Sequence, residues 1–262
     1  MQGGTGNEAD QGDPAGLQPF AGRGLYVIIL LVLINIVNFV DRQLPFILIG
    51  SIKADLQLSD TQIGLMAGLS FAIVYSFAGL VLGRIADRWN PRKVLSLSLL
   101  VWSLATALTG FAQNFLHMVV SRVAVAAGEA GSTPTGHALI SRSYVADRRA
   151  IALALFSCGV PIGSTLGLGL GGWINDLSNW RVAFFIVGLP GLLLALLAWF
   201  TLPEVRRADS SGGAAPTSYG AGLRYLFALP SFRNMAAASS LYAIGSYAMN
   251  VFGPAFLMRV HG

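Results

Sequence analysis

Long apolar runs alternate with short polar segments along most of the chain. Seven runs have roughly the 20 residues that a helix needs to cross the hydrocarbon core of a bilayer. They occupy residues 25–47, 62–83, 94–112, 115–140, 149–172, 182–202 and 234–257. The pattern predicts an all-α membrane protein with seven transmembrane helices, the last of them set apart from the other six.

The polar segments divide the chain into four parts. Residues 1–22 are rich in glycine, aspartate and glutamine and lack the basic start of a signal peptide, so we expect a disordered cytoplasmic tail. Residues 23–202 are expected to form a six-helix transmembrane bundle. Residues 203–233 are expected to form a cytoplasmic linker with a short interfacial helix, because aromatic residues and leucines there stand beside arginines. Residues 234–262 hold the seventh run, and we expect the protein to continue beyond it.

Basic residues gather in alternate loops. One set comprises Arg84, Arg88, Arg92 and Lys93, then Arg142, Arg148 and Arg149, then Arg206, Arg207, Arg224 and Arg233. The opposite loops hold only Lys53 and Arg181, with Arg259 after the seventh run. By the positive-inside rule, the N-terminus and the basic loops face the cytoplasm. We expect a multi-pass membrane protein.

Composition excludes several other classes of protein. The chain is 54% hydrophobic and 11% charged, whereas a soluble domain has about 25% charged residues. A single cysteine, Cys158, excludes an internal disulfide and a multi-cysteine metal site. The basic residues lie in short loops and form no solvated face for nucleic acid. We see no nucleophile–base pair, metal-ligand set or phosphate-binding loop, and we therefore expect neither an enzyme nor a cofactor.

Four ionisable residues lie inside apolar runs: Asp41 and Arg42 in the first, Arg122 and Glu129 in the fourth. Each charge placed in hydrocarbon costs at least about 2.5–3.5 kcal/mol on insertion scales, so these groups are expected to face a protein interior or a water-filled cavity. The seven residues from Arg122 to Glu129 make about two helical turns, which puts both on one face.

These charges suggest a transport site. We expect Glu129 and Asp41 to exchange protons, because a poorly solvated carboxyl group is easily neutralised. We expect Arg42 and Arg122 to bind an anion, since guanidinium groups suit bidentate phosphate contacts. The aromatic residues expected to line the site are Phe39 and Tyr75, with Phe71 and Phe156 as further candidates. In the simpler alternative, these residues are structural. Arg122 then bonds to backbone carbonyls or a neighbouring helix, Glu129 stays paired with an arginine, and the aromatic rings only pack.

The segment after the second run reads G-R-I-A-D-R-W-N-P-R-K from Gly83 to Lys93. This order of glycine, acid, arginine and basic cluster resembles the signature loop of the major facilitator superfamily. It departs from that loop at Asn90 and Pro91, and asparagine tolerates the left-handed conformation that a tight turn requires. The residues that the resemblance assigns to a cytoplasmic gate are Gly83, Asp87, Arg88, Arg92 and Lys93, together with Arg142.

Three short motifs are similar to the Spinster branch of this superfamily. They are the D-R-x-N of the same loop, N-F-V-D-R ending at Arg42, and R-x5-G-E-A from Arg122 to Ala130. The resemblance implies a six-helix bundle built from two inverted three-helix repeats, a linker, and in residues 234–262 the first helix of a C-terminal bundle. The first and fourth runs, which hold the buried charges, occupy equivalent places in such repeats.

The fifth run carries glycine at every fourth position, namely Gly159, Gly163, Gly167 and Gly171. Such a stripe lets another helix pack closely. Pro161 lies within it and is expected to bend the helix, because proline removes a hydrogen-bond donor. The pattern also resembles the Gly-Pro motif of superfamily exporters and antiporters.

The Spinster resemblance implies a secondary active transporter that moves a lysolipid or a phosphorylated sphingoid-type anion by alternating access, driven by protons. Together with the short loops, the resemblance also implies a location in the bacterial inner (plasma) membrane. Two alternatives remain open. One is a proton-coupled transporter of small organic anions that uses the same arginines, and the other is a non-transporting receptor or scaffold on the same fold. The expected partners are the anion, protons and the bilayer, without nucleic acid, and we expect the full-length protein to be a monomer.

Overall fold

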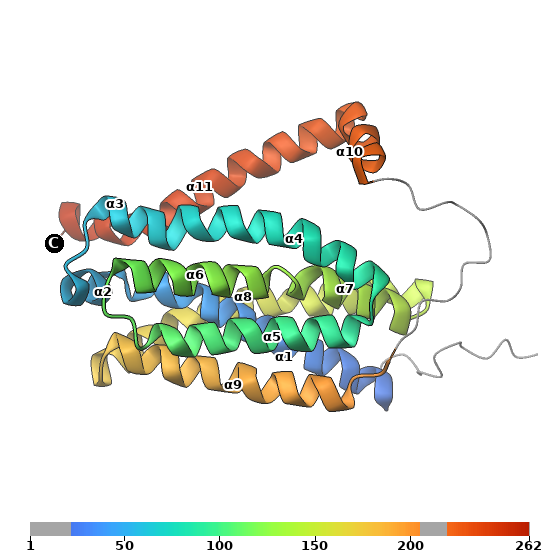
Figure 1. Cartoon of the computed structure of the whole chain (residues 1–262), viewed down its shortest axis with the longest axis horizontal. Helices are drawn as coiled ribbons and strands as arrows, with labels where there is room; N and C mark the ends of the chain where they lie inside the picture. Colours follow the sequence, from blue (N-terminus) through green and yellow to red (C-terminus); the bar gives the residue numbers. More distant parts are fainter. Residues whose placement is uncertain (1–21, 205–218, 262) are drawn as a thin grey trace, which may run out of the picture.

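The computed structural model describes residues 22–204 and 219–261, and every regular element among them is helical (Figure 1). The expected all-α architecture is therefore confirmed for this part of the chain. Nearly all of the expected tail at residues 1–22, and residues 205–218 of the expected linker, lie outside the described residues.

The first six apolar runs form a bundle of roughly parallel and antiparallel helices (Figure 1). The elements are α1 (Arg23–Ile47), α2 (Ile49–Leu56), α3 (Asp60–Ile63), the π-helical η1 (Gly64–Leu69), α4 (Ser70–Arg88), α5 (Pro91–Thr109), α6 (Phe115–Glu129), α7 (Ser132–Ser143), α8 (Ala146–Leu177) and α9 (Trp180–Thr201), followed by α10 (Tyr219–Ala228) and α11 (Pro230–His261). Among the described residues, five stretches are both long and apolar enough to cross a membrane: α1, α3 to α4, α5, α8 and α9.

The fourth apolar run is split into two helices. The break lies between the end of α6 at Glu129 and the start of α7 at Ser132. Pro134 lies in the first turn of α7, where a missing backbone donor costs little. The break occurs where the chain comes very close to α5: a Cβ on Gly128 would lie 2.7 Å from the Trp102 backbone nitrogen. Glu129 is thereby left at the last residue of α6.

The glycines of α8 lie against α1. A Cβ on Gly159 would lie 2.9 Å from Asn35 Cβ, and one on Gly171 would lie 2.7 Å from Ile47 Cγ2. Asn35 Nδ2 also donates a 2.7 Å hydrogen bond to the Phe156 carbonyl oxygen across this interface. The helix α8 continues through Pro161. Close contact along α8 therefore sets the position of α1, which carries Asp41 and Arg42.

We predict that Gly163→Leu destabilises the bundle by about 1–3 kcal/mol or more, because the new side chain overpacks the interface between α8 and α1. A Cβ there would lie 2.8 Å from Phe39 Cβ and closer still to the Ile36 carbonyl oxygen. Gly169→Leu is the matched control, since a Cβ at Gly169 meets nothing within 4 Å. The unfolding midpoint of the purified protein in detergent measures both variants. Equal midpoints would mean that the stripe does not set this packing.

The expected gate segment is mostly helical. Gly83 to Arg88 belong to α4, and only Trp89 and Asn90 join it to α5. Our expectation of a left-handed Asn90 is wrong, because its backbone is extended, with φ −70° and ψ 111°. Its side chain instead accepts a 3.0 Å hydrogen bond from the Arg92 backbone nitrogen. Asparagine here caps α5, a role for which its short amide is well suited.

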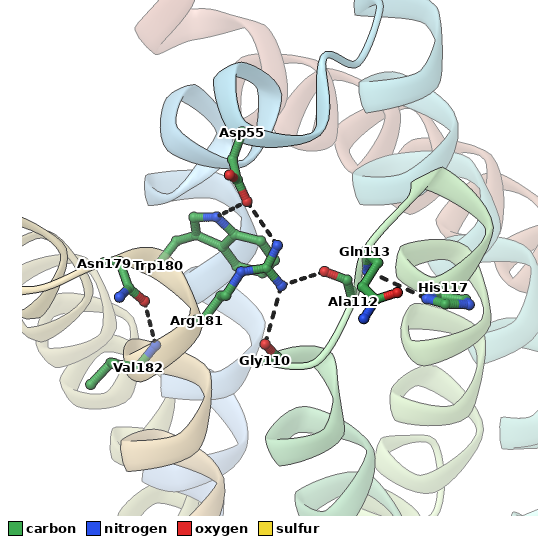
Figure 2. A network of polar contacts seen from close by, with 9 residues as sticks. All are labelled: Asp55, Gly110, Ala112, Gln113, His117, Asn179, Trp180, Arg181 and Val182. Carbon is green, nitrogen blue, oxygen red and sulfur yellow. Dashed lines mark hydrogen bonds and ion pairs between the residues drawn. The ribbon is translucent and has the colours of Figure 1, made fainter.

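A polar network ties three connections together at the end of the bundle near α2 and α3 (Figure 2). Asp55 Oδ2 accepts hydrogen bonds from Arg181 Nη2 at 2.8 Å and from Trp180 Nε1 at 3.1 Å. Arg181 Nη1 also donates to the carbonyl oxygens of Gly110 and Ala112. The network joins α2, the start of α9 and the connection between α5 and α6. It therefore holds these three parts of the bundle together at this end.

The helix α11 lies outside this bundle. It contacts η1 near one of its ends, and it diverges from α4 toward α10 (Figure 1). The Tyr247 ring meets the Phe46 ring edge-on, with centroids 6.5 Å apart. The helix α11 therefore contacts the bundle near η1 and lies farther from α4 toward α10.

Candidate functional site: buried charges beside an apolar cavity

An ion pair joins the first and fourth apolar runs in the middle of the bundle. Both Arg42 Nη2 and Nε donate to Glu129 Oε2, at 2.8 Å and 3.1 Å. The Glu129 side chain is fully buried, whereas 16% of the Arg42 side chain is exposed. Glu129 Oε1 has no hydrogen-bond partner among the described residues. The pair thus has one face in the protein interior and one, at Arg42, toward an opening.

Aromatic rings surround the exposed side of this pair. The Arg42 guanidinium carbon lies 4.7 Å from the centroid of Tyr75, 4.9 Å from that of Phe39 and 5.2 Å from that of Phe71. Phe71 and Tyr75 stack with centroids 5.6 Å apart. A cation over aromatic faces is attracted by their quadrupoles, by up to about 2 kcal/mol where water is excluded. The rings can therefore hold Arg42 in place if its carboxylate partner is lost.

Arg122 is buried deeper, at 2% exposure. Its guanidinium carbon lies 4.6 Å from the Phe71 centroid. Neither its Nε nor its Nη2 has a hydrogen-bond partner in the part of the chain that the structure describes. Arg122 and Glu129 both point into the core from α6, as their spacing predicted, yet it is Arg42 that bonds to Glu129.

Asp41 and Arg42 are neighbours in sequence but contact different helices. Asp41 is 1% exposed, and its Oδ2 accepts a 3.3 Å hydrogen bond from Thr106 Oγ1 on α5. Its Oδ1 has no hydrogen-bond partner within the described ranges. Asp41 and Arg42 therefore do not pair with each other, and Arg42 pairs with Glu129 instead. Two carboxyl and two guanidinium groups share this core, and their formal charges sum to zero.

An apolar cavity of about 560 Å³ opens at Arg42. Its walls come from η1 and α4 on one side and from α11 on the other. Arg42, Tyr75, Ser76 and Tyr247 are its polar residues, and the remainder are small or apolar, including Gly64, Gly68, Leu69, Ala72, Ala243, Ile244, Ala248 and Phe252. The cavity can therefore hold a molecule with an apolar body and one anionic group.

Sequence reasoning missed two parts of this wall. The π-helical turn η1 supplies Gly64 and Gly68, and π-helical turns are rare and frequent at functional sites. The apolar pattern of the second run gives no sign of it. Tyr247 on α11 was also missed, because the seventh run gave no reason to single out one aromatic residue among several.

The residues expected to gate lie at the opposite end of the bundle from α3. Arg92 Nη1 donates to the Leu202 carbonyl oxygen at 3.2 Å, and Arg92 also pairs with Glu204. Arg142 Nη2 donates to the Ala86 carbonyl oxygen at 3.4 Å. Arg88 and Lys93 are exposed. A Cβ on Gly83 would lie 3.8 Å from Pro134 Cβ. The side chain of Asp87 lies outside what the structure describes.

The family follows from a comparison of sequences. The profile of the "Major Facilitator Superfamily" matches residues 31–262. The chain belongs to this superfamily. The expected fold is likewise confirmed by a crystal structure titled as a bacterial homologue of the human lysosomal transporter Spinster, inward-facing and unoccupied. That structure matches with a TM-score of 0.79 and 32% identity, over 94% of this chain and 57% of the other.

Curated relatives point the same way. An "MFS-type efflux pump" from Mycolicibacterium smegmatis is 38% identical over 233 residues, which are 89% of this chain and 54% of the relative. The "Protein spinster homolog 1" of Rattus norvegicus is 30% identical over 264 residues, or 96% of this chain and 50% of the relative. The chain spans about half the length of the curated relatives it matches. Its resemblance to Spinster proteins, predicted from three short motifs, is confirmed.

Proposed function

We propose that the protein is a proton-coupled secondary transporter of an amphiphilic anion, such as a lysolipid or a phosphorylated sphingoid lipid. The observation that carries this proposal is the Arg42–Glu129 ion pair at the wall of an apolar cavity. Similarity to a pump and to Spinster proteins supports transport as the activity.

The ion pair suggests how a proton and an anion are coupled. While Glu129 is ionised, its carboxylate is bonded to the Arg42 guanidinium and repels other anions. A proton on Glu129 removes that competitor, and Arg42 remains over its aromatic rings, ready to bind an anionic head group. Proton binding and anion binding then favour each other, and this coupling is reciprocal. Both would move together as the protein alternates between its two open states.

The cavity favours an amphiphile over a compact anion. One end offers Arg42 and the Tyr75 ring, and the rest of the wall is small or apolar. Burying an acyl chain there contributes about 0.8 kcal/mol for each methylene. A small, fully hydrated carboxylate gains none of this. Asp41 is the second proton-exchange candidate and Arg122 the second anion-binding candidate, since both are buried with unpartnered polar atoms in the described part of the chain.

The remaining expectations fit this proposal. Arg92 and Arg142 would hold the cytoplasmic ends of α4, α5, α7 and α9 together as part of the gate, with Gly83, Asp87, Arg88 and Lys93. In α10, Tyr225 and Phe227 are exposed beside Arg224, as expected of a helix lying in the cytoplasmic interface of the bacterial inner membrane. Residues 23–202 would then be one six-helix unit, and α11 the start of the next.

The experiment is a flux assay on the complete protein in liposomes. A pH gradient is imposed, and uptake of labelled oleoyl lysophosphatidate is followed beside that of a labelled short-chain carboxylate. We expect uptake of the lysolipid that requires the gradient. Protein-free liposomes and an uncoupler that collapses the gradient are the controls.

The other outcomes each remove part of the proposal. Gradient-driven uptake of the carboxylate alone would favour a transporter of small organic anions. Uptake that is unchanged when the uncoupler collapses the gradient would exclude proton coupling. Saturable binding of the lysolipid without uptake would leave a receptor or scaffold on this fold.

A further inference from the structure

Two guanidinium groups lie over one aromatic ring. The Phe71 centroid is 5.2 Å from the Arg42 guanidinium carbon and 4.6 Å from that of Arg122. Phe71 is fully buried, so its ring is shielded from water. Attraction between a cation and a ring face is strongest in such desolvated places. The ring therefore stabilises both positive charges at once.

The two arginines depend on Phe71 to different degrees. Arg42 also bonds to Glu129 and lies over the rings of Phe39 and Tyr75. Arg122 has two guanidinium nitrogens without a hydrogen-bond partner among the described residues. A buried cation that lacks hydrogen bonds carries a large desolvation cost. Phe71 accordingly matters more to Arg122 than to Arg42.

Both arginines are attracted to the Glu129 carboxylate. The charges of Glu129 and Asp41 attract the Arg122 guanidinium, and the Arg42 charge repels it. Arg122 and Glu129 also lie on the same face of α6, while Arg42 reaches Glu129 from α1. A contact that stabilises the Arg122 guanidinium in place of Glu129 leaves the Glu129 carboxylate free to bond to Arg42. The ring face of Phe71 provides that stabilisation.

We propose that Phe71 is a positioning residue that holds Arg122 on its ring and so keeps Glu129 paired with Arg42 until a proton or an anion arrives. This inference rests on the proposed function, because it concerns how tightly the carboxylate blocks the anion-binding arginine. Weakening the ring quadrupole should draw Glu129 toward Arg122, and Arg42 should then bind anions more readily at neutral pH.

The test replaces Phe71 by phenylalanine carrying one, two and three ring fluorines, which keep the shape and progressively weaken the quadrupole. Binding of oleoyl lysophosphatidate to the complete protein in detergent is measured at pH 5.5 and pH 7.5. We expect affinity at pH 7.5 to rise stepwise, by about threefold to tenfold in all, and the difference between the two pH values to shrink. Trifluorination of Phe184, a buried ring that meets Trp180 edge-on, is the matched control.

Each other result is decisive. A flat series overturns the inference and leaves proton coupling untouched. An equal fall in affinity at both pH values means that Phe71 only packs beneath Tyr75, which lines the cavity, and also overturns the inference. If the unsubstituted protein neither binds nor moves the lysolipid, the proposed function fails. The unfolding midpoints of the fluorinated variants, measured without ligand, then test the role of Phe71. A stepwise fall of the unfolding midpoint with each fluorine then supports the role of the ring in holding the two cations, and an unchanged midpoint overturns it.

Discussion

Glu129→Gln is expected to abolish proton-driven accumulation of the anion. A pH difference of two units stores about 2.7 kcal/mol for each proton, which can drive about 100-fold accumulation when one proton moves with one anion. Glutamine cannot take up that proton, so the labelled lysolipid should only equilibrate across the membrane. Flux with and without the gradient, measured on the same liposomes, gives the accumulation ratio directly.

Binding by the same variant should change in the opposite direction. Glutamine leaves Arg42 without the carboxylate that accepts its two hydrogen bonds at 2.8 Å and 3.1 Å. A hydrogen bond to a charged group contributes about 1.5–3 kcal/mol, so affinity for the lysolipid at pH 7.5 should rise about tenfold to 100-fold. Asp176→Asn changes an exposed carboxyl group and is the control. Accumulation that survives in Glu129→Gln would remove Glu129 from the coupling.

Asp41→Asn distinguishes the role of the Asp41 carboxyl group from that of Glu129. Because Asp41 accepts its hydrogen bond from Thr106, its replacement leaves the Arg42–Glu129 pair in place. Affinity at pH 7.5 should therefore stay close to that of the unsubstituted protein, and any loss of accumulation would assign a proton to Asp41 as well.

Much of the fold could be predicted from the sequence, because apolar length alone decides which segments can cross a bilayer. The first run was expected at 25–47 and α1 is Arg23–Ile47, and the sixth was expected at 182–202 and α9 is Trp180–Thr201. The break between α6 and α7 and the π-helical η1 could not be predicted in this way. Both lie within apolar runs, and both depend on neighbouring helices that the pattern does not describe.

The residues of the site could be predicted better than their partners. A buried charge is rare enough in an apolar run to be noticed, so Asp41, Arg42, Arg122 and Glu129 all stood out. Which of them meet is a property of helix packing. Adjacent helical residues point about 100° apart, so Asp41 and Arg42 face different helices. The sequence places two arginines and Glu129 in one core, but it does not say that Arg42 is the arginine that bonds to Glu129.

Removing Arg42 alone is expected to destabilise the protein strongly. Arg42→Met leaves the fully buried Glu129 carboxylate without its cation, and breaking a buried pair in this way costs about 3–5 kcal/mol. The unfolding midpoint in detergent at pH 7.5 should fall accordingly. Lys53→Met removes one partner of the more exposed pair with Asp60, and is the control that should cost no more than about 1 kcal/mol.

The double variant Arg42→Met and Glu129→Met shows which lost interaction lowers the stability of Arg42→Met. If the cost of Arg42→Met comes from the uncompensated carboxylate, removing the carboxylate as well should restore most of the stability, because two apolar side chains of similar length can replace a buried pair at little cost. The double variant should therefore be more stable than Arg42→Met. Equal loss in the single and double variants would instead mean that the Arg42 stem and its aromatic contacts provide the stability. A restored but inactive double variant would show that the pair is retained for transport.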